Sequence, residues 1–521
     1  MTSVGAKGHV AASAFAMSAA TAVSRVLGLV REQVIAALFG AGIATDAYNT
    51  AFRIPNLMRD LFAEGALSAS FVPVFSERLR NASRSAAFRL TNLVINSLLI
   101  VLGAITILIV VFSRELTWVL ASGFFEIQGK AELCVLMTRI LSSFLLVVSL
   151  AAAVMGSLNA LGHFFLPAMA PAVFNAVNIG VTLTLAPYLS RYGINPILAL
   201  AAGSMIGGIA QLGIQVPVLY GEGFRYRPII DVRDAGLRKI ATAMIPAVIG
   251  MSVTQINVVI DTQIASHFGN GPVTWLNYAF RLIQLPIGLF GVSLATVNLA
   301  VISRNLAGGE RGEAAREIGE SLKTSFLLNF AATAGLIALA IPIVQVIFEH
   351  GRFLPADTEA TATAVTLYSL GIAGYAAVKI LAPAFYALED PYLPLKASAT
   401  AIAIKVAANL TLSAFIGFRA VAITTSAAAW INFAILVIAM RSRLPEVRGT
   451  GVLRSTLRSF VLCSAMGLLV WALDLRLAGV MPLPIRLSVL IAVGMVFLFA
   501  VGRAMRLEEI DRLWKVVMRR R

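Results

Sequence analysis

The sequence has few charged residues for its length. Asp, Glu, Lys and Arg make up 13% of its 521 residues, about half the share that is usual in soluble proteins. A soluble fold of this size needs a polar surface, and this composition cannot supply one. The scarcity of charge therefore excludes a cytosolic enzyme, a disordered chain and a secreted scaffold built on disulfides.

Cysteine, histidine and the common catalytic motifs are also scarce. Cys134 and Cys463 both lie inside apolar runs, which predicts core residues rather than a disulfide or a metal pair. The four histidines show no metal-ligand spacing. No G-x-x-x-x-G-K-[ST] motif is present, so the chain has no ATP-binding loop of this type. We predict a protein that is not an enzyme.

Long apolar runs dominate what is present. Hydrophobic residues make up 59% of the chain, and the mean hydropathy is +0.85. The runs are continuous rather than alternating, which favours helices over a β-barrel. Because a membrane-spanning helix needs about 20 apolar residues, we predict an all-α polytopic membrane protein with about fourteen transmembrane helices. These lie at 10–38, 46–76, 90–112, 133–158, 164–187, 196–219, 240–266, 273–302, 324–348, 361–387, 394–417, 420–440, 455–473 and 487–502. The first, second, seventh and eighth are the least apolar.

The basic residues indicate how the chain crosses the membrane. Of the 42 Lys and Arg residues, 27 fall on the side that holds both termini, and seven fall on the other side. Cytoplasmic connections carry such an excess. We therefore predict a multi-pass membrane protein with both termini in the cytoplasm. The net charge of +16 then follows from topology, and we predict no nucleic-acid partner.

Eight basic residues lie at least six residues from either end of a predicted span, and each costs roughly 2.5–3.5 kcal/mol at a helix centre on insertion scales. Such residues persist when they are paired or line a wet cavity. We predict function for four in the least apolar spans, and salt bridges or snorkelling for the others except Arg53, which we leave unassigned. The functional four are Arg25, Arg31, Arg59 and Arg281; the others are Arg53, Arg139, Lys379 and Lys405.

Acidic residues near these arginines can neutralise some of them. Arg25 and Glu32 are seven residues apart, so they share a helix face. The acids in the first two spans do not outnumber the arginines, which leaves a cationic cavity between spans one, two and eight. Pro55 and Pro286 interrupt two of these helices, as is typical where transporters bend. Together these features predict a transporter for an anionic ligand, driven by an ion gradient or the membrane potential.

A short internal repeat indicates two lobes. Ala51-Phe52-Arg53 recurs six predicted spans later as Ala279-Phe280-Arg281, which fits a parallel repeat. We predict an N-terminal six-helix lobe at 1–220 and a C-terminal six-helix lobe at 221–441. Two extra helices and a basic amphipathic tail follow at 442–521.

Motif blocks in the first 430 residues resemble one known family. They include Ser24-Arg25-Val26-Leu27-Gly28, Phe62-Ala63-Glu64-Gly65-Ala66, Tyr278-Ala279-Phe280-Arg281-Leu282 and Gly351-Arg352-Phe353. The chain resembles the MurJ (MviN) family of lipid II flippases, within the multidrug/oligosaccharidyl-lipid/polysaccharide exporter superfamily. The resemblance implies a location in the bacterial inner (plasma) membrane. It also implies that the protein moves undecaprenyl-pyrophosphate-linked peptidoglycan precursor from the cytoplasmic to the periplasmic leaflet by alternating access.

The resemblance also implies site residues and partners. Arg25, Arg31, Arg59 and Arg281 match the family's cavity arginines, and Ser24, Glu32, Asp46, Asn56 and Glu64 match other functional motif positions. In members that bind sodium as a coupling ion, the site matches Asp261, Asn409, Val421 and Thr425, but Ser413 stands where those members have an acid. Other departures are Phe280, Asn298 and Ala300. The implied partners are lipid II, membrane lipids and cell-wall synthesis proteins.

Three other functions compete with this hypothesis. A drug/cation antiporter of the same superfamily should have an acidic, aromatic site rather than an arginine-rich one. An enzyme acting on lipid-linked sugars should show acid clusters or a large soluble loop. A scaffold in a cell-wall complex should tolerate loss of the arginines.

Overall fold

The computed structural model describes residues 3–59 and 66–512, and every regular element in these stretches is a helix. The chain forms two compact units. Unit 1 comprises residues 1–273 and 350–353, and unit 2 comprises residues 274–349 and 354–521. This division differs from the predicted lobes because α12 (Ala235–Ser266) packs within unit 1 against α4 (Ala66–Asn81) and α6 (Ser113–Ala121). The lobe boundaries stay a prediction.

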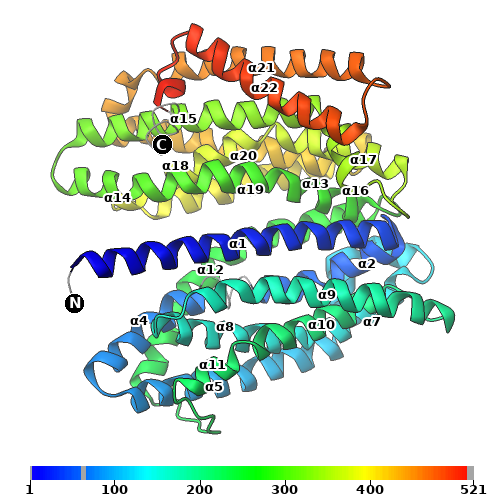
Figure 1. The fold of residues 1–521 in the computed structure, drawn as a ribbon, viewed down its shortest axis with the longest axis vertical. Coiled ribbons are helices and arrows are strands. Elements are labelled where there is room, and N and C mark those ends of the chain that lie inside the picture. Colours follow the sequence, from blue (N-terminus) through cyan, green and yellow to red (C-terminus); the bar gives the residue numbers. More distant parts are fainter. Residues whose placement is uncertain (1–2, 60–65, 513–521) are drawn as a thin grey trace. The chain divides into compact units, whose positions relative to one another are not determined.

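Most helices of unit 1 are long enough to cross a membrane alone or in consecutive pairs (Figure 1). Its further elements are α1 (Ser3–Phe39), α2 (Ile43–Ala51), α3 (Arg53–Arg59), α5 (Arg84–Val111), the short η2 (Ser122–Glu126), α7 (Lys130–Ser142), α8 (Phe144–Ala160), α9 (Phe165–Arg191), α10 (Leu198–Gly213) and α11 (Val216–Gly221). Unit 2 begins within α13.

Unit 2 continues the same pattern of long apolar helices joined by short connections (Figure 1). Its elements are α13 (Pro272–Pro286), the π-helical turn η3 (Ile287–Val292), α14 (Ser293–Ala307), α15 (Arg311–Ala338), α16 (Ala340–Phe348), α17 (Pro355–Ser369), α18 (Ile372–Ala387), α19 (Tyr392–Ile416), α20 (Arg419–Arg443), η4 (Pro445–Thr450), α21 (Val452–Leu477) and α22 (Leu483–Ala504).

The prediction of an all-α polytopic membrane protein is confirmed. Among the described residues, nine helical stretches are long and apolar enough to cross a membrane, and the pair α17 and α18, bent by 42°, makes a tenth. The four predicted spans that do not meet this criterion are the four least apolar ones. They are helical nonetheless, as α1, α2 to α4, α12 and α13 to α14.

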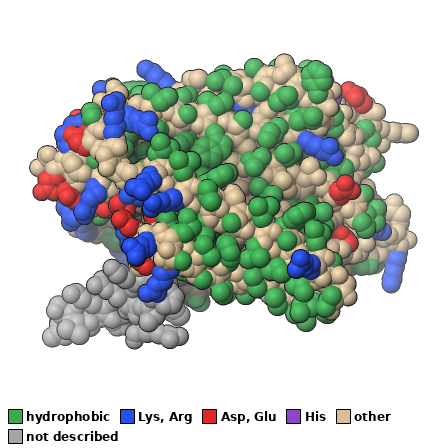
Figure 2. All heavy atoms as spheres, turned by 90° about the horizontal axis from the view of Figure 1, so that it is seen from above, with side chains coloured by type: hydrophobic (Ala, Val, Ile, Leu, Met, Phe, Trp, Pro, Cys, Tyr) green, Lys and Arg blue, Asp and Glu red, His purple; other side chains and the backbone are tan. Residues whose placement is uncertain are grey.

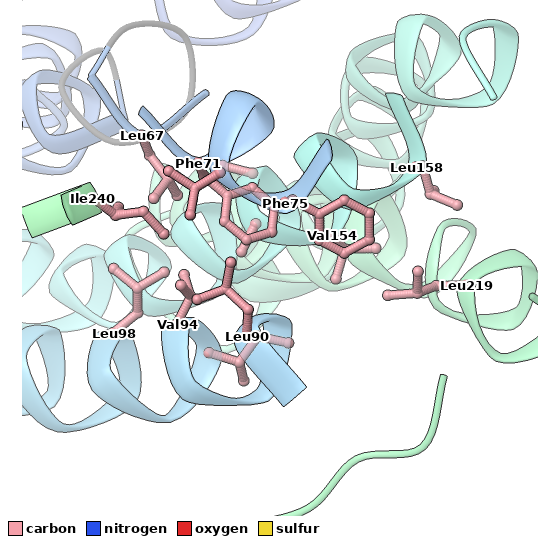
Figure 3. Packing of buried hydrophobic residues seen from close by; sticks show 14 of the residues in the cluster. Leu67, Phe71, Phe75, Leu90, Val94, Leu98, Val154, Leu158, Leu219 and Ile240 are labelled. Carbon is pink, nitrogen blue, oxygen red and sulfur yellow. The ribbon is translucent and has the colours of Figure 1, made fainter. Parts of the chain in front are cut away.

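The core of unit 1 lies between α4, α5 and α8. Phe71 and Phe75 of α4 point toward Leu90 and Val94 of α5, as Figure 3 shows, and all four side chains are buried. Gly156 of α8 permits this packing, because a Cβ there would lie 2.9 Å from the Phe71 ring. Small residues at helix contacts allow such close approach in membrane proteins.

The core of unit 2 lies between α15, α18, α19 and α20, and the C-terminal pair α21 and α22 packs on α15. Cys463 of α21 is buried and unpaired, as is Cys134 of α7, which confirms the prediction for both cysteines. Beyond α22, Leu507 and Ile510 are buried within the protein. Residues 513–521 of the predicted amphipathic tail lie outside the described residues.

Large apolar side chains are exposed on the outer helices of both units. Phe415 is 83% exposed, and Ile438, Leu468 and Val496 are each more than 60% exposed. Figure 2 shows hydrophobic side chains across the middle of the visible face, with most of its charged side chains toward one end. Such a surface is expected of helices that face lipid.

Candidate functional site

The sequence-predicted site residues divide between the two units. Unit 1 holds Ser24, Arg25, Arg31 and Glu32 on α1, Asp46 on α2, and Asn56 and Arg59 on α3, whereas Arg281 belongs to α13 of unit 2. Glu64 lies outside the described residues, and so does the side chain of Arg59. Asn56 is half-buried in α3.

Arg31 is buried where α1 packs against α9. Its guanidinium donates to Glu32 Oε1 at 2.8 Å and to Asn175 Oδ1 at 3.1 Å, and it lies 5.6 Å from the centre of the Phe174 ring. Only 9% of Arg31 is exposed. These contacts give Arg31 a fixed position, because a buried cation is retained where an acid and hydrogen bonds compensate for lost water.

Asn175 of α9 connects two of the motif positions on α1. Its amide Nδ2 donates to the backbone oxygen of Ser24 at 3.3 Å, while its Oδ1 accepts from Arg31. Gly28 of α1 faces the same amide, and a Cβ added to this glycine would lie 3.6 Å from Asn175 Nδ2. Sequence reasoning missed Asn175, although an amide inside an apolar helix is a signal in itself.

Arg25 has a different environment from Arg31. It lies on the face of α1 that stays exposed, together with Val26 and Leu29. It makes no ion pair or hydrogen bond through its side chain with any described residue, so the predicted pairing with Glu32 is not formed. The reason is that Glu32 is buried and binds its chain neighbour Arg31 instead. Arg25 thus presents an exposed cation on a helix predicted to span the membrane.

Arg281 is exposed on α13, and its Nε donates to Asn277 Oδ1 one turn earlier at 3.1 Å. The other side of this helix is packed: Tyr278 stacks on Phe348 at 4.6 Å, and Phe280 contacts Tyr368 edge-on at 5.6 Å. Phe280, one of the departures from the family pattern named above, therefore packs within unit 2. Ala300 is exposed, and the side chain of Asn298 lies outside the described part.

Two of the segments that carry arginines are interrupted helices, whereas α1, which carries Arg25 and Arg31, is continuous. The chain breaks between α2 and α3 at Phe52, whose ring stacks on Tyr48 at 5.5 Å. In unit 2, α13 ends at Pro286 and continues as the π-helical turn η3. Proline removes a backbone donor, and π-helical turns are frequent at functional sites in helices. The breaks lie close in sequence to Arg53 and Arg281.

Asp46 is fully buried in an ion pair that the sequence did not reveal. Lys130 of α7 donates to Asp46 Oδ2 at 2.9 Å, to the Gly269 carbonyl at 2.9 Å and to Asn270 Oδ1 at 3.2 Å. The backbone N–H of Gly271 also donates to Asp46 Oδ2, at 2.7 Å. Both side chains have no exposed area. The pair joins α2 and α7 to the connection after α12.

The residues matched to a sodium site do not form a complete cation site within one unit. Asn409, Val421 and Thr425 are buried on α19 and α20, and Asn409 Oδ1 accepts from the Thr424 hydroxyl at 2.8 Å. Asp261 belongs to α12 of unit 1. The ammonium of Lys405, one turn before Asn409, is also buried, and a fixed cation disfavours a second one. Among the described residues no cluster of three acidic, histidine or cysteine ligands occurs.

A bundle of membrane-length helices that carries exposed arginines, Arg25 on the continuous helix α1 and Arg281 shortly before the break after α13, is typical of a polytopic membrane transporter. Solved structures agree with this class. A lipid II flippase MurJ in an inward closed conformation has a TM-score of 0.77 and 26% identity, over 94% of this chain and 99% of that one. An inward-facing MATE-family multidrug resistance transporter of the MOP superfamily shares the fold, with a TM-score of 0.69 and 14% identity over 82% and 96%.

Sequence comparisons define the family. The model of the family described as lipid II flippase MurJ matches residues 35–488. A lipid II flippase MurJ from Burkholderia cenocepacia is 34% identical, over 82% of this chain and 83% of the relative. A probable lipid II flippase MurJ from Vibrio cholerae is also 34% identical, over 81% of each chain. This chain belongs to the lipid II flippase MurJ family.

Proposed function

We propose that this chain moves lipid II from the cytoplasmic to the periplasmic leaflet of the inner membrane by alternating access, with both termini in the cytoplasm. Family membership supports the substrate. The observation that carries the mechanism is the exposed Arg25, which lies on a helix predicted to span the membrane and has no carboxylate partner among the described residues. A cation in that setting requires an anionic ligand or water to offset its cost.

The chemistry of a pyrophosphate fits a set of arginines. Each guanidinium offers several N–H donors in a planar fork that binds phosphate oxygens in a bidentate way. We assign Arg25, Arg31, Arg59 and Arg281 to the head group. Arg31 differs from Arg25 in being held by Glu32 and Asn175, which fixes its position before the ligand arrives.

Polar motif residues complete the proposed site. Asn56 offers an amide on the helix that carries Arg59, and Ser24 offers a hydroxyl beside Arg25. We assign both, together with Glu64 and Glu32, to the orientation of the head group and the arginines. Asp46 contributes by holding α2 in place, because its carboxylate is occupied by Lys130.

The membrane potential can drive this movement. A potential that is negative in the cytoplasm favours outward transfer of an anion by about 2.3 kcal/mol per net charge per 100 mV. No step of the proposal requires sodium.

Binding of purified lipid II to Arg25→Ala and Arg281→Ala variants tests the proposal. We expect each variant to bind roughly 10- to 100-fold more weakly than the unmodified protein, because charged hydrogen bonds contribute about 1.5–3 kcal/mol. Arg448→Ala is the matched control, since Arg448 is exposed in η4 and lies outside the proposed site. Unchanged lipid II binding in both site variants would contradict the assignment.

The same assay separates the proposal from the antiporter alternative. Tetraphenylphosphonium, a lipophilic organic cation, should not displace lipid II from the unmodified protein. A drug/cation antiporter should instead bind this cation, and should bind it more tightly when an arginine is removed.

A further inference from the structure

A cavity of about 250 Å³ lies in unit 1 between the start of α6 and α7, and none of the proposed head-group residues lines it. Arg114, Phe125, Glu132, Val135, Leu136 and Arg139 line it together with Ala131. Its walls therefore combine two guanidinium groups with an aromatic ring and aliphatic side chains.

Neither guanidinium is neutralised by an acid. Arg139 Nε donates to the Ser113 hydroxyl at 2.8 Å, and Arg114 lies 5.4 Å from the centre of the Phe125 ring. Within residues 3–59 and 66–512, no carboxylate forms an ion pair with either arginine. Glu132 also lines the cavity, so the lining carries a net charge of +1.

The lack of an acidic partner is unusual at the position of Arg139. It lies nine residues into the apolar stretch Lys130–Ala160, roughly 14 Å along the helix at 1.5 Å per residue. An arginine at such a depth is costly unless its head group reaches polar partners. Its bond to Ser113 directs the guanidinium toward the start of α6, where Arg114 lies.

The surface beside the cavity is apolar and exposed. Phe112, Trp118 and Val119 are each more than 50% exposed, and Leu136 is 43% exposed. Tryptophan is frequent on membrane-protein surfaces near the lipid head groups. The cations are thus next to a surface suited to acyl chains, and this combination matches the phosphate and the tails of one lipid molecule.

We propose that Arg114 and Arg139 bind the phosphate of an anionic phospholipid, whose acyl chains lie on the exposed apolar side chains of α6 and α7. Charge complementarity selects the ligand, because the net positive cavity favours an anionic head group over a zwitterionic one. The site is separate from lipid II transport, and it does not depend on which side of the membrane it faces.

Native mass spectrometry of the purified full chain tests the proposal with dioleoyl phosphatidylglycerol as the probe. We expect the Arg114→Gln/Arg139→Gln variant to retain one phosphatidylglycerol fewer than the unmodified protein. Arg191→Gln is the matched control, because Arg191 is exposed at the end of α9 and is absent from the cavity lining. It should retain the full number.

A variant that should bind phosphatidylglycerol more tightly gives a second test, because misfolding does not produce a gain in affinity. Glu132→Gln removes the acid from the lining, so we expect it to hold phosphatidylglycerol more tightly, with at least a threefold lower dissociation constant. Equal retention by the double variant and the unmodified protein would overturn the proposal. Equal affinity for dioleoyl phosphatidylcholine, or displacement of the lipid by millimolar inorganic phosphate, would overturn the assignment to an anionic lipid.

Discussion

Burial separates two kinds of charged residue in this protein. Arg31, Asp46 and Lys130 are buried and bound to partners, whereas Arg25 is exposed on α1 and Arg281 on α13. A buried charge has already exchanged water for fixed partners, so its removal affects stability first. Arg25 is exposed and has no ion-pair partner among the described residues, so its guanidinium is available to an anion.

The Asp46–Lys130 pair provides a test of this distinction. Asp46→Asn should lower the free energy of unfolding by about 3–5 kcal/mol, because it leaves the ammonium of Lys130 buried without its carboxylate. Thermal unfolding in detergent measures the effect. The double variant Asp46→Leu/Lys130→Met should recover most of the loss, since apolar replacements of a buried pair are often tolerated.

A different result would assign Asp46 to the substrate. If Asp46→Asn unfolded at the same temperature as the unmodified protein but bound lipid II more weakly, the ion pair would not be its main role.

Sequence reasoning could select the charged residues but not sort them. Arg25 and Arg31 both satisfied the criterion of an arginine in a weakly apolar span. Their difference depends on α9, which lies more than 130 residues later in the chain and supplies Asn175 and Phe174. Lys130 was counted only as a basic residue in a connection, because its partner Asp46 is 84 residues away.

At the scale of elements, the connector at residues 222–234 is bound along α5. Asn92 donates to the Arg225 carbonyl at 3.0 Å, and Asn96 donates to the Arg227 and Ile229 carbonyls at 2.8 and 3.0 Å. The connector has no regular structure of its own, so these amides satisfy backbone groups that would otherwise lack partners near the membrane. This explains two asparagines in the apolar helix α5.

Removal of one amide should release the connector. We expect Asn96→Leu to raise the rate of trypsin cleavage after Arg225 at least several-fold, while helix α5 stays intact. Ser97→Leu is the control, because Ser97 makes no hydrogen bond to the connector among the described contacts. Equal cleavage of both variants would show that the amides do not hold this segment.

Acid should loosen the end of the connector. Hydrogen bonding to Arg89 lowers the pKa of Asp231, and bonds from Arg78 and backbone N–H groups outweigh burial to lower the pKa of Asp234. A carboxylate whose pKa is lower in the folded than in the unfolded state stabilises the fold fully at pH values above its unfolded-state pKa, which is about 3.9 for aspartate. This stabilisation is lost as the pH falls through the pKa of the folded state. Hydrogen exchange of residues 222–234, corrected for intrinsic rates, should stay constant from pH 7 to about pH 4 and rise below it. A rise between pH 7 and 5 would contradict this account.

The end of α1 packs closely against the turn at residues 351–352, and a glycine on each side permits this approach. Gly40 has φ +66°, and a Cβ there would lie 2.4 Å from the Arg352 carbonyl oxygen; a Cβ at Gly351 would lie 2.3 Å from that of Ala37. The Arg352 N–H donates to the Ala37 carbonyl at 2.8 Å. Gly40→Ala should therefore lower the unfolding temperature by several degrees, whereas Gly42→Ala, with open space around it, should not. Equal effects of the two substitutions would contradict this contact.

Hydropathy predicted the helices well because lipid requires long apolar segments with internal backbone bonds. It was weakest for α1, α2 to α4, α12 and α13 to α14, which together carry most of the proposed head-group residues. The breaks at Phe52 and after Pro286 were partly indicated by proline. The packing of α12 in unit 1 could not be predicted, because it depends on contacts with α4 and α6 rather than on position in the chain.

At the scale of the whole molecule, this protein is a membrane transporter of the lipid II flippase MurJ family. We propose that Arg25 and Arg281 are both required to move lipid II across the membrane. The fold alone does not establish this, because a MATE-family multidrug transporter shares it at 14% identity.

The most direct test is lipid II exposure on the outer face of the inner membrane in bacteria depleted of their own lipid II flippase. Expression of this chain should restore exposure, and Arg25→Ala and Arg281→Ala should each abolish it while Arg448→Ala does not. Restored exposure by both site variants, at matched expression and membrane insertion, would contradict the claim.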